Sequence, residues 1–161
     1  MPGSLLQCAR FMAQLALTLV KRALPSPTAA HSANIDTDEA LIEALQTGDI
    51  ATLDRYGPRL AMGQDRLGSP HFFLALETGS LTAVTWFLAQ GASATQPDRA
   101  GRLPLETVIQ RAALADDLDD HTADCAAMVQ ALIACGASLA ARSTTGTTLA
   151  DLAASAGLDL A

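Results

Sequence analysis

Aromatic residues are scarce in this chain of 161 residues, which has one tryptophan, one tyrosine and four phenylalanines, whereas alanine and leucine are abundant. That composition favours closely packed short helices over a β-sandwich, so we expect an all-α protein. Half of the residues are apolar, which is enough for one continuous core.

Cysteines are also few. Cys8, Cys125 and Cys135 are too irregularly spaced for a disulfide framework, and no Cys-x-x-Cys pair occurs. We therefore expect buried thiols in a reducing compartment, and we predict the cytoplasm as the location.

Positive charge is in short supply as well. The net charge of −7 argues against nucleic acid as a partner, because phosphate contacts need a basic surface. The distribution is uneven, since residues 1–35 contain three basic residues and no acidic one, whereas the rest of the chain is strongly acidic. Two differently built segments are predicted, residues 1–33 and residues 34–161.

The sequence lacks the signatures of common enzymes, including the phosphate loop, Gly-x-Ser-x-Gly and His-Glu-x-x-His. His31, His71 and His121 share no spacing, and no histidine or acid is placed in sequence to activate Cys125 or Cys135. We predict no enzymatic activity, no cofactor and no metal site.

A repeated glycine pattern is what the sequence does contain. Gly68 and Gly101 are 33 residues apart, whereas Gly101 and Gly146 are 45 apart, as are Gly91 and Gly136. The longer step equals the shorter one plus an insertion of 12 residues. We expect Gly91 and Gly136 to cap helices in a left-handed conformation and the other three to close tight turns.

Two stretches make the pattern specific. Residues 79–92 (GSLTAVTWFLAQGA) read as a helix with a glycine stop, and residues 98–106 (DRAGRLPLE) read as a turn followed by a helix that begins at Pro104. Together they resemble the ankyrin-repeat family. The resemblance implies a solenoid of helix-turn-helix units with hairpin-like loops. The units lie near residues 34–64, 65–97, 98–142 with the insertion, and 143–161, which is truncated.

Local patterns predict more detail within these units. Helices are expected over Glu39–Thr47 and Ile50–Tyr56, and Gly57-Pro58 ends the second one. Trp86 falls at an inward-facing position, which predicts core packing. Small side chains are expected where neighbouring inner helices press together, at Ala75, Ala153 and Ala154.

Two features invite a metal reading. His71 stands at a helix start, and we interpret it as a packing or capping residue. Asp116–Asp120 with His121 is an acidic run, but it lacks the glycine turn and closing glutamate of a calcium loop. A solvated loop that leads into a helix over Thr122–Ala134 is predicted instead.

Residues 5–24 form a separate segment. Polar residues recur every three or four positions from Gln7 to Lys21, which predicts an amphipathic helix with a wide apolar face that ends at Pro25. It fits an extended cap on the first repeat, or a targeting or membrane-surface segment, of which a cleaved signal peptide is one version. A membrane-spanning helix fits less well, because Arg10 leaves only about ten uncharged residues where about 20 are needed.

The resemblance implies a binding module that contacts another protein on the concave face formed by inner helices and hairpin tips. We predict a monomer with that function. The alternative is an exported bacterial effector or a periplasmic binding protein whose N-terminal segment is a targeting signal; one lysine against nine arginines is typical of a GC-rich bacterial genome. The predicted partner-binding residues are Gln64, Asp65, Arg66, Phe73, Glu77, Gln96, Asp98, Arg99, Arg102, Gln110, Arg111 and Arg142.

Overall fold

The computed structural model describes residues 39–115 and 121–158. The predicted amphipathic helix at 5–24 and the acidic run Asp116–Asp120 lie outside these ranges. Within the described residues every regular element is a helix and no strand occurs, which confirms the all-α class. None of these helices combines the length and the apolar character that crossing a bilayer requires.

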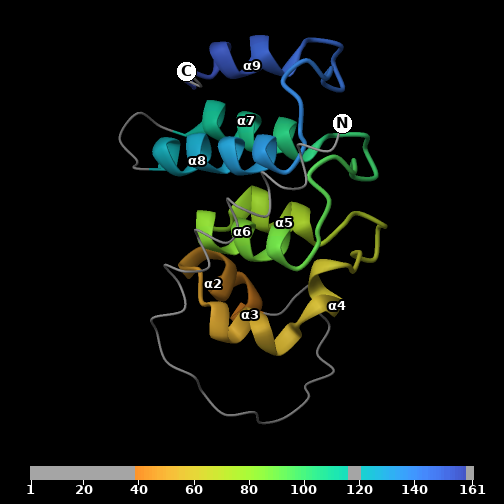
Figure 1. The fold of residues 1–161 in the computed structure, drawn as a ribbon, viewed down its shortest axis with the longest axis vertical. Coiled ribbons are helices and arrows are strands. Elements are labelled where there is room, and N and C mark those ends of the chain that lie inside the picture. Colours follow the sequence, from red (N-terminus) through yellow and green to blue (C-terminus); the bar gives the residue numbers. More distant parts are fainter. Residues whose placement is uncertain (1–38, 116–120, 159–161) are drawn as a thin grey trace.

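Six of the described helices form three consecutive pairs (Figure 1). The pairs are α2 (Glu39–Thr47) with α3 (Ile50–Tyr56), α5 (Phe72–Thr78) with α6 (Leu81–Ala89), and α7 (Pro104–Leu114) with α8 (His121–Ala134). The short helix α4 (Pro58–Ala61) follows the first pair, and α9 (Leu149–Ser155) follows the third. The bounds of α2 and α3 are those expected from the sequence.

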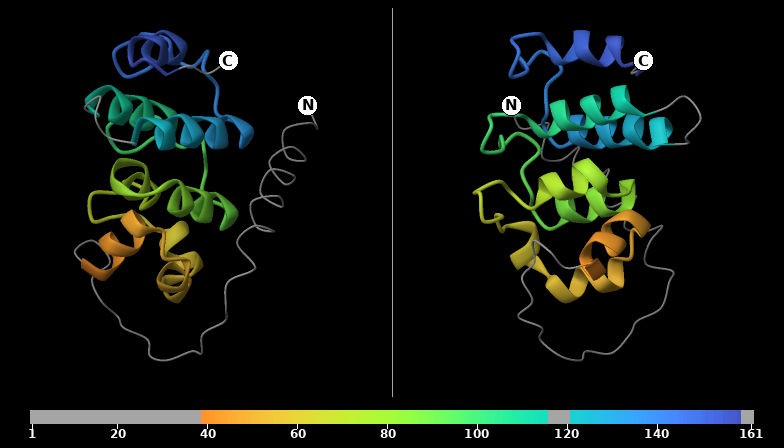
Figure 2. Two further views of the ribbon diagram at one scale, coloured as in Figure 1. Left: turned by 90° about the vertical axis from the view of Figure 1, so that its left-hand side faces the viewer. Right: turned by 180° about the vertical axis from the view of Figure 1, so that it is seen from behind.

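The pairs stack in layers, so that the first helices form one row and the second helices form another (Figures 1 and 2). α5 packs between α2 and α7, and α7 also packs against α9; α2, α5, α7 and α9 are called the inner row here. α6 packs between α3 and α8, and these three form the outer row. The core is buried between the layers, where Leu53, Leu76, Phe87 and Met128 are fully enclosed.

Three tight turns lie along one edge of the stack, at the right in Figure 1. In each turn a glycine N–H donates to the carbonyl three residues earlier, at 3.0, 3.0 and 2.9 Å for Gly68, Gly101 and Gly146. The φ angles of these glycines are 88°, 84° and 86°, so the predicted turn closure is confirmed. Residues 64–70, 97–103 and 142–148 are together called the turn edge.

Helix ends also follow the expected glycine pattern. Gly91 and Gly136 have φ angles of 97° and 105°, the left-handed conformation that ends a helix. The N–H of the next residue, Ala92 or Ala137, donates at 3.0 Å to the carbonyl five residues earlier. Glycine adopts this conformation without the steric cost that a side chain brings.

Polar side chains fix several helix starts. Ser80 Oγ accepts from the Ala83 N–H at 3.3 Å and begins α6. Asp49 accepts from two backbone N–H groups of α3 and from Thr52 Oγ1, the last at 2.6 Å. The Thr52 hydroxyl, together with those N–H groups, lowers the pKa of the Asp49 carboxyl below its ordinary value, because each bond favours the ionised form.

Trp86 joins the first two layers. Its side chain is 6% exposed, which confirms the predicted core packing. The indole Nε1 donates to Asp54 Oδ1 of α3 at 2.7 Å, and the ring meets Phe87 edge-on with centroids 5.2 Å apart. The contact therefore links α6 to α3 by both apolar burial and a hydrogen bond.

The third pair is longer than the second. α7 and α8 have 11 and 14 residues, whereas α5 and α6 have 7 and 9. The 12-residue insertion therefore extends both helices as well as the connection between them. α8 begins at His121, one residue before the predicted start.

One expectation about close packing is wrong. Ala75 and Ala153 are buried as predicted, but Ala154 is exposed. α9 packs mainly against α7, and that contact uses the side of α9 that carries Ala153. Neighbouring positions on a helix point about 100° apart, so Ala154 lies off this contact.

A Gly48→Ala substitution is expected to destabilise the chain more than Gly101→Ala. Both glycines have positive φ, 71° and 84°, so each alanine is strained by about 1–2 kcal/mol. A Cβ on Gly48 would also lie 2.8 Å from the Cβ of Thr82, whereas nothing lies within 4 Å of one on Gly101. The clash adds about 1–3 kcal/mol. Urea unfolding followed by circular dichroism measures both losses, and equal losses would contradict the close approach at Gly48.

Candidate functional site

The acidic residues of the turn edge hold their own turns in shape. Asp65 Oδ1 accepts from the backbone N–H groups two and four residues later, both at 2.8 Å. Asp98 Oδ1 makes the same pair of bonds at 2.8 and 2.9 Å. Such side-chain bonds add to the backbone hydrogen bonds that already close each turn. The two carboxylates are therefore parts of the scaffold.

Arg102 connects the turn edge to the inner row. Its Nε donates to Asp98 Oδ2 at 2.8 Å, and its Nη2 donates to Glu77 Oε1 at 2.9 Å. Burial alone would lower the pKa of Arg102, but the hydrogen bonds to these two carboxylates outweigh it and raise the pKa above its ordinary value. The chain itself thus supplies two carboxylate partners for this charge.

Other arginines of the turn edge donate to backbone carbonyls. Arg99 Nη1 reaches the Leu67 carbonyl at 3.2 Å, which ties the second turn to the first. Arg142 Nη1 donates to the Gly146 carbonyl at 2.6 Å within its own turn. Arg66 is exposed. Because a guanidinium has five N–H donors, Arg99 and Arg142 keep donors for a further partner.

Arg111 fixes α7 against the end of α5. Its Nη1 donates to the carbonyls of Gly79 at 2.7 Å and Leu76 at 3.2 Å. The last carbonyls of a helix have no partner within the helix and carry partial negative charge, so a cation is favoured there. Among the described residues no carboxylate pairs with Arg111.

Glu106 ties α7 to the third turn. Its carboxylate is fully buried and accepts from the Thr144 hydroxyl at 2.7 Å and from the Thr144 N–H at 3.1 Å. It also accepts from Gln110 Nε2 at 3.3 Å. A buried carboxylate is tolerated because these donors replace the water it has lost.

A hollow of about 450 Å³ lies between the end of α5 and α7. We call it the α5–α7 groove, and its lining residues are Glu77, Arg102, Thr107, Gln110, Arg111, Leu114 and Ala115. The structure thus brings together four predicted contact residues, namely Glu77, Arg102, Gln110 and Arg111. The volume falls within the roughly 300–1,000 Å³ that is typical of ligand sites.

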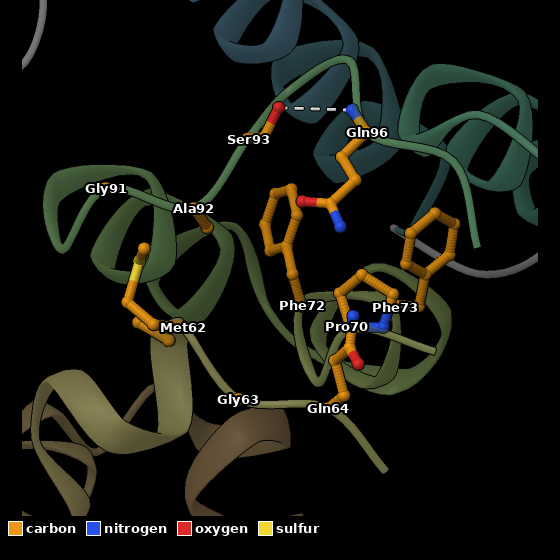
Figure 3. Close-up of a pocket in the computed structure, with 11 residues that line it drawn as sticks. Met62, Gly63, Gln64, Pro70, Phe72, Phe73, Gly91, Ala92, Ser93 and Gln96 are labelled. Atoms are coloured by element: carbon orange, nitrogen blue, oxygen red, sulfur yellow. Dashed lines mark hydrogen bonds between the residues drawn. The ribbon is translucent and has the colours of Figure 1, made fainter. Parts of the chain in front are cut away.

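A smaller cavity of about 120 Å³ lies between the first turn with the start of α5 and the segment that follows α6 (Figure 3). The predicted contact residues Gln64, Phe73 and Gln96 are among its lining residues, together with Met62. Ser93 Oγ accepts from the Gln96 N–H at 3.1 Å, which holds the backbone above the cavity. With no charged side chain in its lining, this cavity is the weaker candidate for a polar ligand.

Two predicted contact residues are buried. Phe73 is only 4% exposed because it packs into the core, and Asp98 is 7% exposed because its side chain turns into its own turn. Asp98 is engaged by its own turn and by Arg102, whereas Phe73 reaches only the lining of the smaller cavity. The other predicted residues lie at the turn edge, in the linker after α6, or in the groove.

Sequence reasoning missed Thr107, Leu114 and Ala115. Leu114 is 86% exposed, which is unusual for a leucine in the last turn of a core helix. One signal was available: Leu114 lies in the length that the insertion adds to α7, where the longer helix has no equal neighbour to pack against.

Two residues with reactive or metal-binding side chains, Cys125 and His71, are buried. Burial raises the pKa of the Cys125 thiol above its ordinary value, although the Arg111 charge opposes this. His71 is buried against Gly63, as expected for a packing residue. In the part of the chain that the structure describes, no three metal-binding side chains gather. The acidic run Asp116–Asp120 lies outside that part.

The chain matches no model of a known protein family. No curated protein matches its sequence either.

Replacing Glu106 is expected to cost stability according to how many acceptors are lost. Glu106→Ala leaves buried donors without an acceptor and lowers the free energy of unfolding by about 2–4 kcal/mol. Glu106→Gln keeps one oxygen for Thr144 and costs less. Urea unfolding measures both, with Glu43→Ala at an exposed position of α2 as the control. Equal stability of Glu106→Ala and wild type would contradict a structural role for the carboxylate.

Proposed function

We propose that this chain is a small ankyrin-repeat protein that binds another protein and catalyses no reaction. The binding surface combines the turn edge with the inner row. The observation that carries the proposal is the α5–α7 groove, where Glu77, Arg102, Gln110 and Arg111 from two layers meet beside the turn edge.

Recurrence of one turn geometry supports the repeat assignment. Gly68 and Gly101 are 33 residues apart and close turns with the same hydrogen bond and nearly the same φ. Each of these turns leads into a helix of the inner row, and a second helix of the outer row follows. Such units expose one long surface made of turns and inner helices.

Preorganisation supports binding through this surface. Arg102 is held by two carboxylates and Arg111 by two carbonyls, so both side chains are already fixed before a partner arrives. Fixing a long side chain in advance removes part of the entropy cost of association. A polar partner therefore meets donors that need little rearrangement.

The charge of the turn edge indicates the partner's chemistry. It carries four arginines, Arg66, Arg99, Arg102 and Arg142, whereas its two acids, Asp65 and Asp98, are engaged within their turns. The whole chain is acidic, with a net charge of −7. A partner with an acidic or mixed patch fits this edge, and its affinity falls as salt screens the attraction.

Substituting Arg66, Arg99 and Arg102 together by alanine is expected to reduce partner capture by about tenfold or more, because several cationic contacts are lost at once. The measurement is a pull-down from lysate of the source cells with full-length wild type and variant. Raising the salt concentration is expected to weaken wild-type capture.

The matched control is Arg55→Ala with Arg59→Ala, which removes exposed arginines in α3 and α4, away from the proposed surface. Circular dichroism establishes that each variant is folded. Equal capture by wild type and the triple variant, or capture that is insensitive to salt, would overturn the choice of surface.

A further inference from the structure

The last turn of α7 extends past the end of α5. Arg111 reaches the carbonyls of Leu76 and Gly79, so it lies level with the last turn of α5. Leu114 comes three residues later, about 4.5 Å further along the helix axis. It has no helix of equal length beside it in the inner row, and it is 86% exposed.

The exposed leucine belongs to the lining of the α5–α7 groove. Thr107, Gln110 and Ala115 line the same hollow of about 450 Å³. Met62 and Leu67, the other two large apolar side chains exposed in the described ranges, do not line this groove. An apolar side chain that enters the groove and covers Leu114 removes apolar surface from water on both sides of the contact.

Arg111 gives the groove its charge preference. The charge of Arg102 is matched by Asp98 and Glu77, whereas Arg111 donates only to backbone carbonyls in the described part of the chain. Only its Nη1 is used in those bonds, so further N–H donors are available. Arg111 is thus the groove cation best placed to receive a carboxylate from outside.

We propose that the α5–α7 groove binds a short acidic segment of the partner protein, with an apolar side chain against Leu114 and a carboxylate on Arg111. The proposal rests on the binding role proposed above and names the chemistry of its ligand. Arg111 and Leu114 are three residues apart and share one face of α7. The apolar and acidic side chains of the ligand are therefore two to four residues apart in its sequence.

Charge favours this occupant over a basic one. A lysine-rich segment would place its positive charges beside those of Arg111 and Arg102, which repel them. The cost of removing the lysines from water would also not be offset, because Glu77, the carboxylate of the lining, already pairs with Arg102. The basic residues 1–35 of this chain are disfavoured as occupants for the same reason.

The test is a nuclear magnetic resonance titration of ¹⁵N-labelled full-length chain with short synthetic peptides. Each peptide has a serine and alanine background with one leucine and two adjacent glutamates, at a spacing of two, three or four residues. One matched set carries lysine in place of glutamate, and another carries serine in place of leucine. Binding in the millimolar range or tighter is measurable by amide shifts.

For at least one spacing, we expect shifts centred on Thr107–Ala115 and affinity about tenfold higher than for the lysine counterpart, as expected for one charge-assisted contact. Leu114→Ser is expected to weaken binding several-fold. Met62→Ser, which removes an exposed apolar side chain that lies outside both the groove and the turn edge, is expected to leave it unchanged. Arg111→Gln is expected to abolish the preference for glutamate over lysine.

Three outcomes would overturn the proposal: no binding by any glutamate peptide, equal binding by the lysine set, or unchanged binding by Leu114→Ser. Amide spectra establish that each variant is folded. If the peptides fail while arginine-dependent partner capture holds, the groove assignment alone is wrong. If both fail, the proposed function is wrong as well.

Discussion

Burial of apolar side chains between neighbouring layers holds the described part of the chain together. Its helices have only 4 to 14 residues, and a pair of short helices cannot enclose its own apolar faces. Leu76 and Phe87 are fully buried because the second layer has the first layer on one side and the third on the other. Each layer is therefore stable only as part of the stack, and the groove between α5 and α7 exists only while these layers stay in contact.

Polar side chains then determine how each layer sits on the next. The Arg111, Glu106 and Trp86 side chains bond to partners 32 to 38 residues away, always in an adjacent layer or turn. Apolar contacts tolerate small sliding movements, whereas these bonds demand a particular alignment. Arg111 has two roles in this protein. It fixes the alignment of α7 with α5, and it lines the groove.

The parts of the fold that follow from local backbone chemistry were predictable. Glycines in the sequence indicate where turns close and helices end, and polar residues indicate where helices begin. The bounds of α2 and α3 agree with these signals. Burial of Phe73 and Asp98, exposure of Ala154 and the protrusion of Leu114 depend on which helix lies beside each residue. Tertiary packing decides which helix lies beside each residue, and local sequence patterns do not record it. The sequence therefore predicted four lining residues of the groove, Glu77, Arg102, Gln110 and Arg111, but not the other three. The repeat family and the partner stay proposals.

The bond between Trp86 and Asp54 has a practical meaning for how the stack comes apart. Trp86 is the single tryptophan of the chain, and it stands at the joint between the first and second layers. Its fluorescence therefore reports on the packing around that joint, while circular dichroism averages over all helices. In a stack held by nearest neighbours, an end layer can detach before the rest. Emission that shifts ahead of the loss of helix signal records such fraying, and coincident changes record a single cooperative transition.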